Sequence, residues 1–147
     1  MKIIDMHAHL WMSDVIRRGI EDHGAIGVKL WVSERYDSPC MDEISKLIID
    51  YGVPLLIHAH TRAKPAAAIP TENTSVNIRN LALRYPELKI IMAHIDAKCY
   101  RGAQNVRGLD NVYVDFSGGT GRAGEVEYAY SQLGEDKILF GTYLSAD

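Results

Sequence analysis

Residues 53–58 read VPLLIH and residues 88–94 read LKIIMAH, and each run ends in a histidine. Both runs are apolar over nearly their whole length, without the alternation of polar and apolar residues that marks a half-exposed strand. Strands that are buried on both faces have this pattern, which is typical of parallel sheets. The two runs therefore predict buried strands that each carry a histidine at the carboxyl end.

Similar runs recur along the chain and alternate with helical patterns. In SPCMDEISKLIIDYG, residues 38–52, Ser38 suits a helix N-cap, Pro39 the first helical position and Gly52 the stop. Further helices are expected over 13–21, 78–85, 98–108 and 126–133. Strands are expected over 2–6, 25–31, 53–58, 88–93, 111–116 and 137–140. Strand followed by helix, about six times, predicts an α/β fold of βα units around a parallel sheet.

Composition and charge are ordinary for a single globular domain and offer no sign of a nucleic-acid or membrane partner. The 147 residues suit one domain over 1–147, and the net charge of −3 offers no basic surface for nucleic acid or a membrane. No apolar run is long enough to span a bilayer, and the first residues do not resemble a signal peptide. Cys40 and Cys99 form no CxxC pair, so we expect reduced, packed thiols and a cytoplasmic location.

Histidines gather where the predicted strands end. Residues 5–9 read DMHAH, and side chains two apart on a strand share a face, so His7 and His9 can reach one metal ion. An isolated HxH motif is explained equally well without a metal, by one histidine that packs in the core and one that is exposed to solvent. The strand at 53–58 ends with His58, His60 follows two residues later, and the next strand is followed by His94. Because carboxyl ends of parallel strands share one mouth, we predict a common metal or catalytic site there.

Six segments resemble, in order, the strand ends of the amidohydrolase superfamily: IIDMHAHL, IGVKLW, VPLLIH, LKIIMAH, NVYVDFSG and KILFGT. They are most similar to its amidohydrolase-related branch, which includes the aminocarboxymuconate-semialdehyde decarboxylase-like enzymes. The resemblance implies a TIM barrel with a divalent metal, usually one zinc, at its mouth. It implies that His7, His9 and His58 are metal ligands and that His94 acts in catalysis.

The chain departs from this family in two ways. The resemblance implies an aspartate after the last strand, where this chain has Tyr143, and Asp147 follows four residues later. The segment between HAHLW and AIGVKLW is too short for the two βα units that the family has there, and a TIM barrel rarely has fewer than about 200 residues. We therefore expect an incomplete, TIM-barrel-derived domain of about six βα units. A homo-oligomer is one way to cover its exposed sheet edges.

The resemblance implies a metal-dependent hydrolase in which an activated water attacks an ester, lactone or amide. A metal-dependent decarboxylase and a catalytically impaired remnant are the alternatives, and the sequence does not decide among them. His94 would shuttle a proton or stabilise an oxyanion. His60, Arg62 and Lys29 are candidate substrate contacts, although Arg62 also suits a solvated loop. Lys29 also suits an ion pair or, by resemblance, a carboxylated lysine between two metals.

Three further residues at strand ends are candidates for supporting roles. Asp115 ends a strand and could orient a histidine. Trp11 and Trp31 follow strands and suit either core packing or a pocket wall.

Overall fold

The structure is a computed structural model that describes residues 4–6, 12–31, 34–60, 71–118 and 122–141. Every predicted strand and helix is found there, and β2 to β6 are each a few residues shorter than predicted. None of the helices within these ranges is long and apolar enough to cross a membrane. The strands are β1 (Ile4–Met6), β2 (Val28–Leu30), β3 (Leu55–His58), β4 (Ile90–Ala93), β5 (Val112–Asp115) and β6 (Ile138–Leu139). The helices are α1 (Met12–Glu21), α2 (Met41–Tyr51), α3 (Ser75–Arg84), α4 (Cys99–Val106) and α5 (Glu125–Leu133), with the short turns η2 (His94–Ala97) and η3 (Glu135–Lys137).

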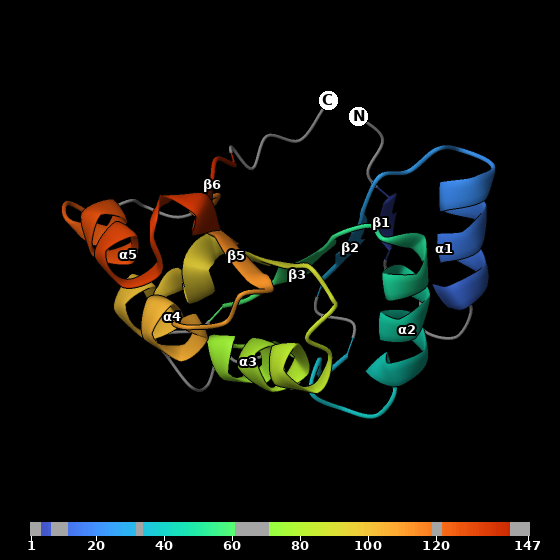
Figure 1. The fold of residues 1–147 in the computed structure, drawn as a ribbon, viewed down its shortest axis with the longest axis horizontal. Helices are drawn as coiled ribbons and strands as arrows, with labels where there is room; N and C mark the ends of the chain where they lie inside the picture. The colour runs from blue at the N-terminus through green and yellow to red at the C-terminus, as the bar shows by residue number, and fades with distance from the viewer. Residues whose placement is uncertain (1–3, 7–11, 32–33, 61–70, 119–121, 142–147) are drawn as a thin grey trace.

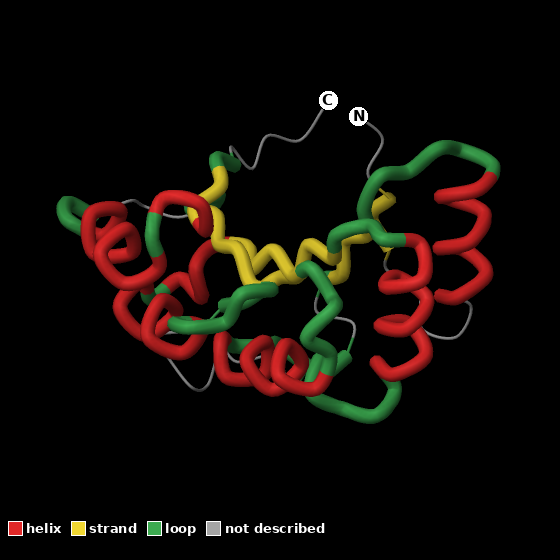
Figure 2. The backbone as a smooth tube through the Cα atoms, in the orientation of Figure 1, coloured by secondary structure: helices red, strands yellow, loops and turns green. Residues whose placement is uncertain are grey.

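The six strands form one parallel sheet in the order of the sequence. Among the described residues β1 and β6 do not pair with each other, so the sheet is an open, curved strip rather than a closed barrel. Figures 1 and 2 show the helices along the outer, convex side of the strip. Because all strands run the same way, their carboxyl ends form one rim.

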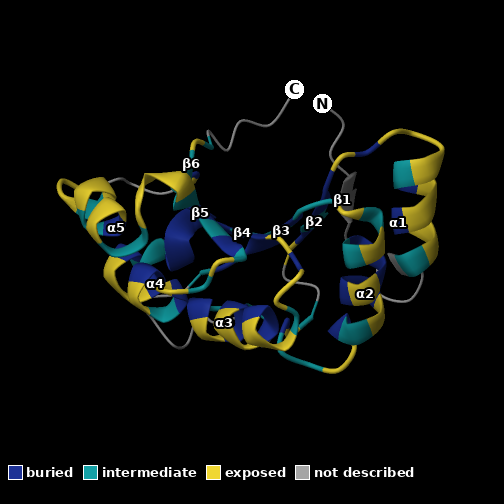
Figure 3. Cartoon of the chain, viewed as in Figure 1, coloured by how far each residue is buried: buried dark blue, intermediate teal, exposed yellow. Residues whose placement is uncertain are grey.

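The outer face of the sheet is the hydrophobic core. In-register pairing places Leu30 beside Ile57 and Ile57 beside Met92, and none of the three side chains is exposed. Burying each such side chain contributes about 1.5–3 kcal/mol to folding. Figure 3 shows buried residues along the central strands and on parts of the helices that cover them. The core positions of the four central strands are Val28, Leu30, Leu55, Ile57, Ile90, Met92, Val112 and Val114.

The inner face of the sheet is less buried than predicted, because the strands were expected to be buried on both faces. The residues that alternate with the core positions, Lys29, Leu56, Ile91 and Tyr113, are only half-buried. Pairing places them in one row across β2 to β5. In a closed barrel such a row would face the strands opposite, but this sheet is open. The apolar pattern therefore predicted the strands correctly and the burial of one face wrongly.

Helix α2 begins later than its N-terminal signals predict. Its N-cap is Cys40 rather than Ser38, and Pro39 precedes the helix. The Ser38 carbonyl accepts hydrogen bonds from the Met41 N–H and from Arg84 Nη2, so a contact with α3 holds this segment in a turn. Cys40, predicted to be packed, is exposed. The stop was predicted correctly, because Gly52 ends the helix at φ 64°, a left-handed conformation that glycine adopts at little cost.

Helix α5 is present where its apolar stripe predicts it, but most of that stripe is not buried. Ala129 is buried, whereas Val126 is 51% and Tyr130 55% exposed. The helix lies at the β6 end of the open sheet and packs on α4 on one side. Phe140, just beyond β6, is 93% exposed. The unpaired end of the sheet therefore leaves apolar side chains in solvent.

The turn η2 between β4 and α4 is left-handed throughout. Its residues His94, Ile95, Asp96 and Ala97 have φ values of 64°, 38°, 66° and 49°. Helix α4 packs against this turn through Gly102, where an added Cβ would lie 2.4 Å from the carbonyl oxygen of Ile95. A glycine is required because no larger residue leaves room for that carbonyl.

We predict that Gly102→Ala lowers the free energy of unfolding by about 1–3 kcal/mol, because the new methyl group meets backbone that cannot rotate away. Urea unfolding measures the change. Gln104→Ala, an exposed position on the same helix, serves as the control and should change stability by less than about 0.5 kcal/mol. Equal stability of Gly102→Ala and the unmodified protein would contradict this packing.

Candidate metal and catalytic site

Three of the predicted site residues meet at the rim of the sheet. His58 is the last residue of β3, His60 follows two residues later, and His94 comes directly after β4. The ring centroids of His58 and His94 are 5.0 Å apart, and the His60 ring stacks on that of His58 at 5.9 Å. The structure thus brings together three imidazoles from two neighbouring strands.

His58 is held as a neutral imidazole. Its side chain is only 11% exposed, and burial, together with the nearby His94, lowers its pKa to about 4. Trp31, which is 40% exposed, stands edge-on to it at 6.3 Å and forms a wall of the rim. A neutral imidazole keeps one nitrogen lone pair, which is the form that binds metal ions.

Glu72 is a member of this site that the sequence analysis missed. Its side chain is 4% exposed, and Oε1 lies 3.4 Å from His58 Nε2. The residue belongs to the segment between β3 and α3, which is rich in polar and small residues. One glutamate in such a segment carries no periodic signal. The only hint is that the segment leaves the strand that ends in His58 and His60.

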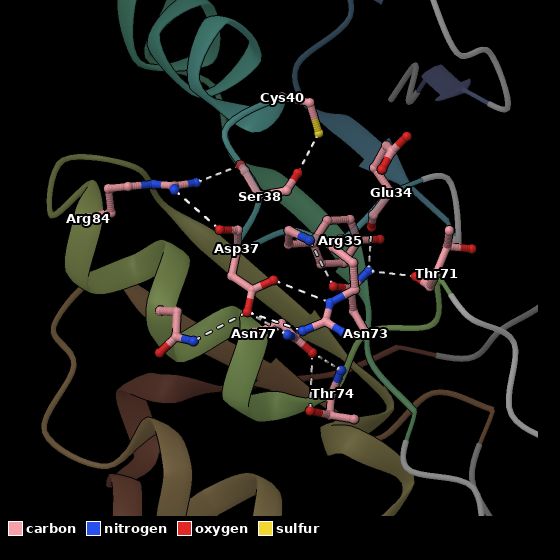
Figure 4. A network of polar contacts seen from close by, with 12 residues as sticks. Glu34, Arg35, Asp37, Ser38, Cys40, Thr71, Asn73, Thr74, Asn77 and Arg84 are labelled. Carbon is pink, nitrogen blue, oxygen red and sulfur yellow. Dashed lines mark hydrogen bonds and ion pairs between the residues drawn. The ribbon is translucent and has the colours of Figure 1, made fainter. Parts of the chain in front are cut away.

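Asn73 holds this segment in place. Its side chain accepts a hydrogen bond from the Tyr36 N–H (2.8 Å) and donates to the carbonyls of Glu34 (2.6 Å) and Thr71 (3.0 Å). Its own carbonyl accepts the His60 N–H at 2.8 Å. Figure 4 shows the Asn73 side chain with its hydrogen bonds to Glu34 and Thr71. One fully buried amide therefore fastens the β2–α2 connection to the segment after β3, next to Glu72.

Asp37 extends the same network to α3 (Figure 4). Burial raises the pKa of Asp37, but hydrogen bonds from Asn77, Arg35 and Asn80 outweigh it and lower the pKa below its ordinary value. Arg84 donates to the carbonyl of Asp37 at 3.3 Å. Hydrogen bonds therefore fasten the described part of the β2–α2 connection, residues 34–38, to Asn73 and to α3.

His94 is oriented by the end of β5. Asp115 Oδ1 accepts the backbone N–H of His94 (3.0 Å), the N–H of Ser117 (2.8 Å) and the Ser117 hydroxyl (2.5 Å). His94 Nδ1 lies 2.5 Å from the Ser117 carbonyl oxygen, which can only accept. Nδ1 therefore carries the proton in neutral His94, and Nε2 is the basic nitrogen. Asp115 does orient a histidine, as proposed from the sequence, but through the backbone and not through the ring.

A buried polar group fixes the left-handed turn that begins at His94. Asp96 is fully buried and accepts a hydrogen bond from Ser75 Oγ at 2.6 Å. Asn105 donates to the same Ser75 hydroxyl, and Arg101 Nε lies 3.9 Å from the carboxylate. Each left-handed residue other than glycine costs about 1–2 kcal/mol. Strain of this kind is concentrated at functional sites, where surrounding contacts hold it.

Most of the other predicted site residues lie outside the described residues or away from the rim. His7, His9, Arg62, Tyr143 and Asp147 lie outside the described residues, as does Trp11. Lys29 is half-buried on the inner face and pairs in register with Leu56, two residues before His58. It therefore lies one layer below the rim, and its contact with a substrate stays a prediction. Exposed His23 precedes β2, at the opposite end of the sheet.

The described residues contain no complete metal site, but one pair of side chains has a spacing that suits a metal ion. No group of three histidine, cysteine, aspartate or glutamate side chains in the described ranges could hold an ion alone. His58 and Glu72 place a nitrogen and an oxygen 3.4 Å apart. Two ligands of a tetrahedral zinc, each bound at about 2.0–2.2 Å, are separated by about 3.4 Å, so the pair fits such an ion. The other ligands would have to come from residues 7 and 9, beyond β1.

The comparisons with known proteins agree with this architecture. A family model described as Amidohydrolase matches residues 12–142. No curated protein matches the sequence. Among solved structures, a TIM-barrel protein from Bordetella bronchiseptica matches 95% of this chain and 52% of its own, at 17% identity and a TM-score of 0.67.

Two further solved structures have similar folds. Amidohydrolase 2 from Bifidobacterium longum subsp. infantis matches 81% of this chain and 47% of its own, at 17% identity and a TM-score of 0.61. The 4-oxalomesaconate hydratase from Rhodopseudomonas palustris matches 90% and 46%, at 14% identity and a TM-score of 0.59. The chain thus spans about half the length of the solved structures that it matches.

We predict that Asn73→Ala lowers the free energy of unfolding by about 2–4 kcal/mol, because the N–H of Tyr36 and two carbonyls lose their partner inside the protein. Asn80→Ala, which removes a single exposed bond to Asp37, is the matched control and should change stability by less than about 0.5 kcal/mol. Urea unfolding compares the two variants. Similar values for both would show that Asn73 does not hold the rim together.

We also predict that Ala97→Gly raises the free energy of unfolding by about 1 kcal/mol, because it relieves left-handed strain and the loss of chain entropy offsets only part of the gain. Ala123→Gly is the control, since Ala123 is exposed and does not have a positive φ. It should leave the protein equal or slightly less stable. A loss of stability in Ala97→Gly would contradict the strained turn.

Proposed function

The chain belongs to the amidohydrolase family, and from that premise we propose that its rim is the active site of a metal-dependent hydrolase of the aminocarboxymuconate-semialdehyde decarboxylase-like branch. The observation that carries the proposal is the convergence of His58 and His94 at the carboxyl ends of β3 and β4. The substrate would be a small molecule with an ester, lactone or amide bond. The chain spans half of each related structure, so the activity of a whole protein is part of the same proposal.

A divalent ion, most simply one zinc, would be held by His7, His9 and His58. His58 suits this role because it is buried and neutral at pH 7. When bound, such an ion supplies Lewis acidity and lowers the pKa of water toward 7. Pairing of β1 with β2 and β2 with β3 sets β1 about 9.6 Å from β3. Histidine side chains that reach toward each other from the β1 side and from β3 can span this separation with an ion between them.

His94 would move the proton. Its Nδ1 is bonded to the Ser117 carbonyl, so Nε2 can accept a proton from the attacking water and deliver it to the leaving group. Asp115 holds the backbone of His94 and so sets where the ring stands. His60, Lys29 and Arg62 are the proposed substrate contacts. Trp31 would limit the access of solvent on the β2 side.

Two alternatives use the same residues. In a decarboxylase, carbon dioxide would leave the substrate and His94 would protonate the carbon that remains, while His7, His9 and His58 would hold an ion that binds the substrate oxygens. The hydratase from Rhodopseudomonas palustris has a similar fold, which supports a reaction class wider than hydrolysis. In an impaired remnant, Tyr143 in place of the aspartate would leave the site without one of its groups.

The open sheet supports one further expectation. Its edges at β1 and β6 and the exposed Phe140 suit coverage by a second copy of the chain, so a homo-oligomer stays a proposal. A cytoplasmic location is likewise an expectation, drawn from the two unpaired cysteines.

We predict that His94→Asn lowers kcat/KM by about 10²–10⁴, because asparagine tolerates the left-handed backbone but cannot transfer a proton. The measurement is turnover of a panel of esters, lactones, amides and carboxylated acids by zinc-loaded protein, with carbon dioxide release to detect decarboxylation. His23→Asn, at the opposite end of the sheet, should retain full activity.

Metal content separates the enzyme from the remnant. Purified protein should hold zinc, and His58→Ala should lose it. Equal metal in both proteins, or metal in neither, would contradict the proposed site, as would unchanged activity in His94→Asn.

A further inference from the structure

Glu72 and His58 form a buried pair at the rim that a hydrogen bond explains poorly. The 3.4 Å between His58 Nε2 and Glu72 Oε1 is longer than the usual 2.7–3.2 Å of an N–H···O bond. It equals the separation of about 3.4 Å expected for two ligands of one tetrahedral zinc. Both side chains are almost fully shielded from solvent, at 11% and 4% exposure. The separation of the two atoms is therefore compatible with two ligands of one ion.

The backbone around Glu72 holds it ready for a ligand. Asn73, the next residue, is fully buried and joined by hydrogen bonds to Tyr36, Glu34 and Thr71. The Asn73 carbonyl also accepts the N–H of His60, which ties the carboxylate segment to the end of β3. Binding residues on such a braced backbone lose little entropy when the ligand arrives.

A third group at the rim lacks a partner. His60 Nδ1 is buried and finds no hydrogen-bond partner among the residues that the structure describes. Its ring stacks on His58 with an angle of 2° between the planes. Buried polar atoms without a partner are rare, and an absent ion, water or ligand is a common reason. This part of the rim therefore has Glu72 and His58 at the spacing of two metal ligands. It also has His60 Nδ1, which makes no hydrogen bond to the described residues.

We propose that Glu72 is the carboxylate ligand of this site and binds the divalent ion together with His58. This rests on the proposed function, which supplies the ion. Position 143 holds a tyrosine, which is neutral near pH 7, so the carboxylate comes from the segment after β3 instead of the end of the last strand. A carboxylate from a segment braced by Asn73 reaches the ion without the aspartate that the resemblance implies.

The test uses the full chain and the ions Zn²⁺ and Co²⁺ as probes. Zinc affinity is measured by competition with a chelating dye, and cobalt coordination by visible absorption, for wild type, Glu72→Gln, Glu72→Asp and His58→Ala. Glu87→Gln, an exposed glutamate between α3 and β4, is the matched control. Circular dichroism confirms that each variant is folded.

We expect Glu72→Gln to lower zinc affinity more than 100-fold and to change the cobalt spectrum, since one ligand is lost. Glu72→Asp should recover at least 10-fold of that affinity, and Glu87→Gln should match wild type. A residue that only supports a ligand costs about 10–100-fold and leaves the ligand set intact. An unchanged cobalt spectrum in Glu72→Gln therefore overturns the proposal. If Glu72→Gln binds no ion or does not fold, Glu72→Asp decides, and failure of Glu72→Asp to bind overturns it.

The two proposals fail in different ways. If wild type takes up neither ion, the metal-dependent function itself fails. If wild type binds and His58→Ala does not, but Glu72→Gln keeps the wild-type affinity and spectrum, only the role of Glu72 is wrong.

Discussion

Parallel, in-register pairing of the strands is the constraint on which the rest of this structure depends. Leu30, Ile57 and Met92 stand side by side on the outer face, fully buried under the helices. Since side chains alternate along a strand, this register also decides which residues face inward and which end at the rim. A slip of one residue would turn His58 toward the helices. The apolar layer and the polar site are therefore set by the same pairing.

Within the described residues the sheet is open, and polar contacts in the connections support the rim in place of barrel closure. Asn73 ties the connection before α2 to the segment after β3. Asp115 joins the ends of β4 and β5 through the backbone of His94. Each of these groups is buried and satisfies several backbone groups at once, so its bonds are strong and its loss is costly. Contacts at the rim therefore hold the site in place.

The electrostatics of the rim suit the binding of a cation better than that of an anion. Burial keeps His58 neutral near pH 7, and the bond from Nδ1 to Ser117 sets the tautomer of His94. Glu72 adds a shielded carboxylate beside these imidazoles. The left-handed turn that begins at His94 costs free energy that the Asp96–Ser75 bond helps to offset. The strain at η2 and the buried carboxylate are both features that packing alone would not select.

The sequence by itself determined the strands, the helices, their parallel order and the histidines at the strand ends, because apolar periodicity and strand-end position are local signals. His58, His60 and His94 meet as predicted for that reason. Only the tertiary structure decided that the sheet stays open, that α2 begins at Met41, and that Glu72, Asn73 and Asp96 belong to the rim. These depend on contacts between segments distant in sequence, such as Arg84 with Ser38, and no local pattern encodes them.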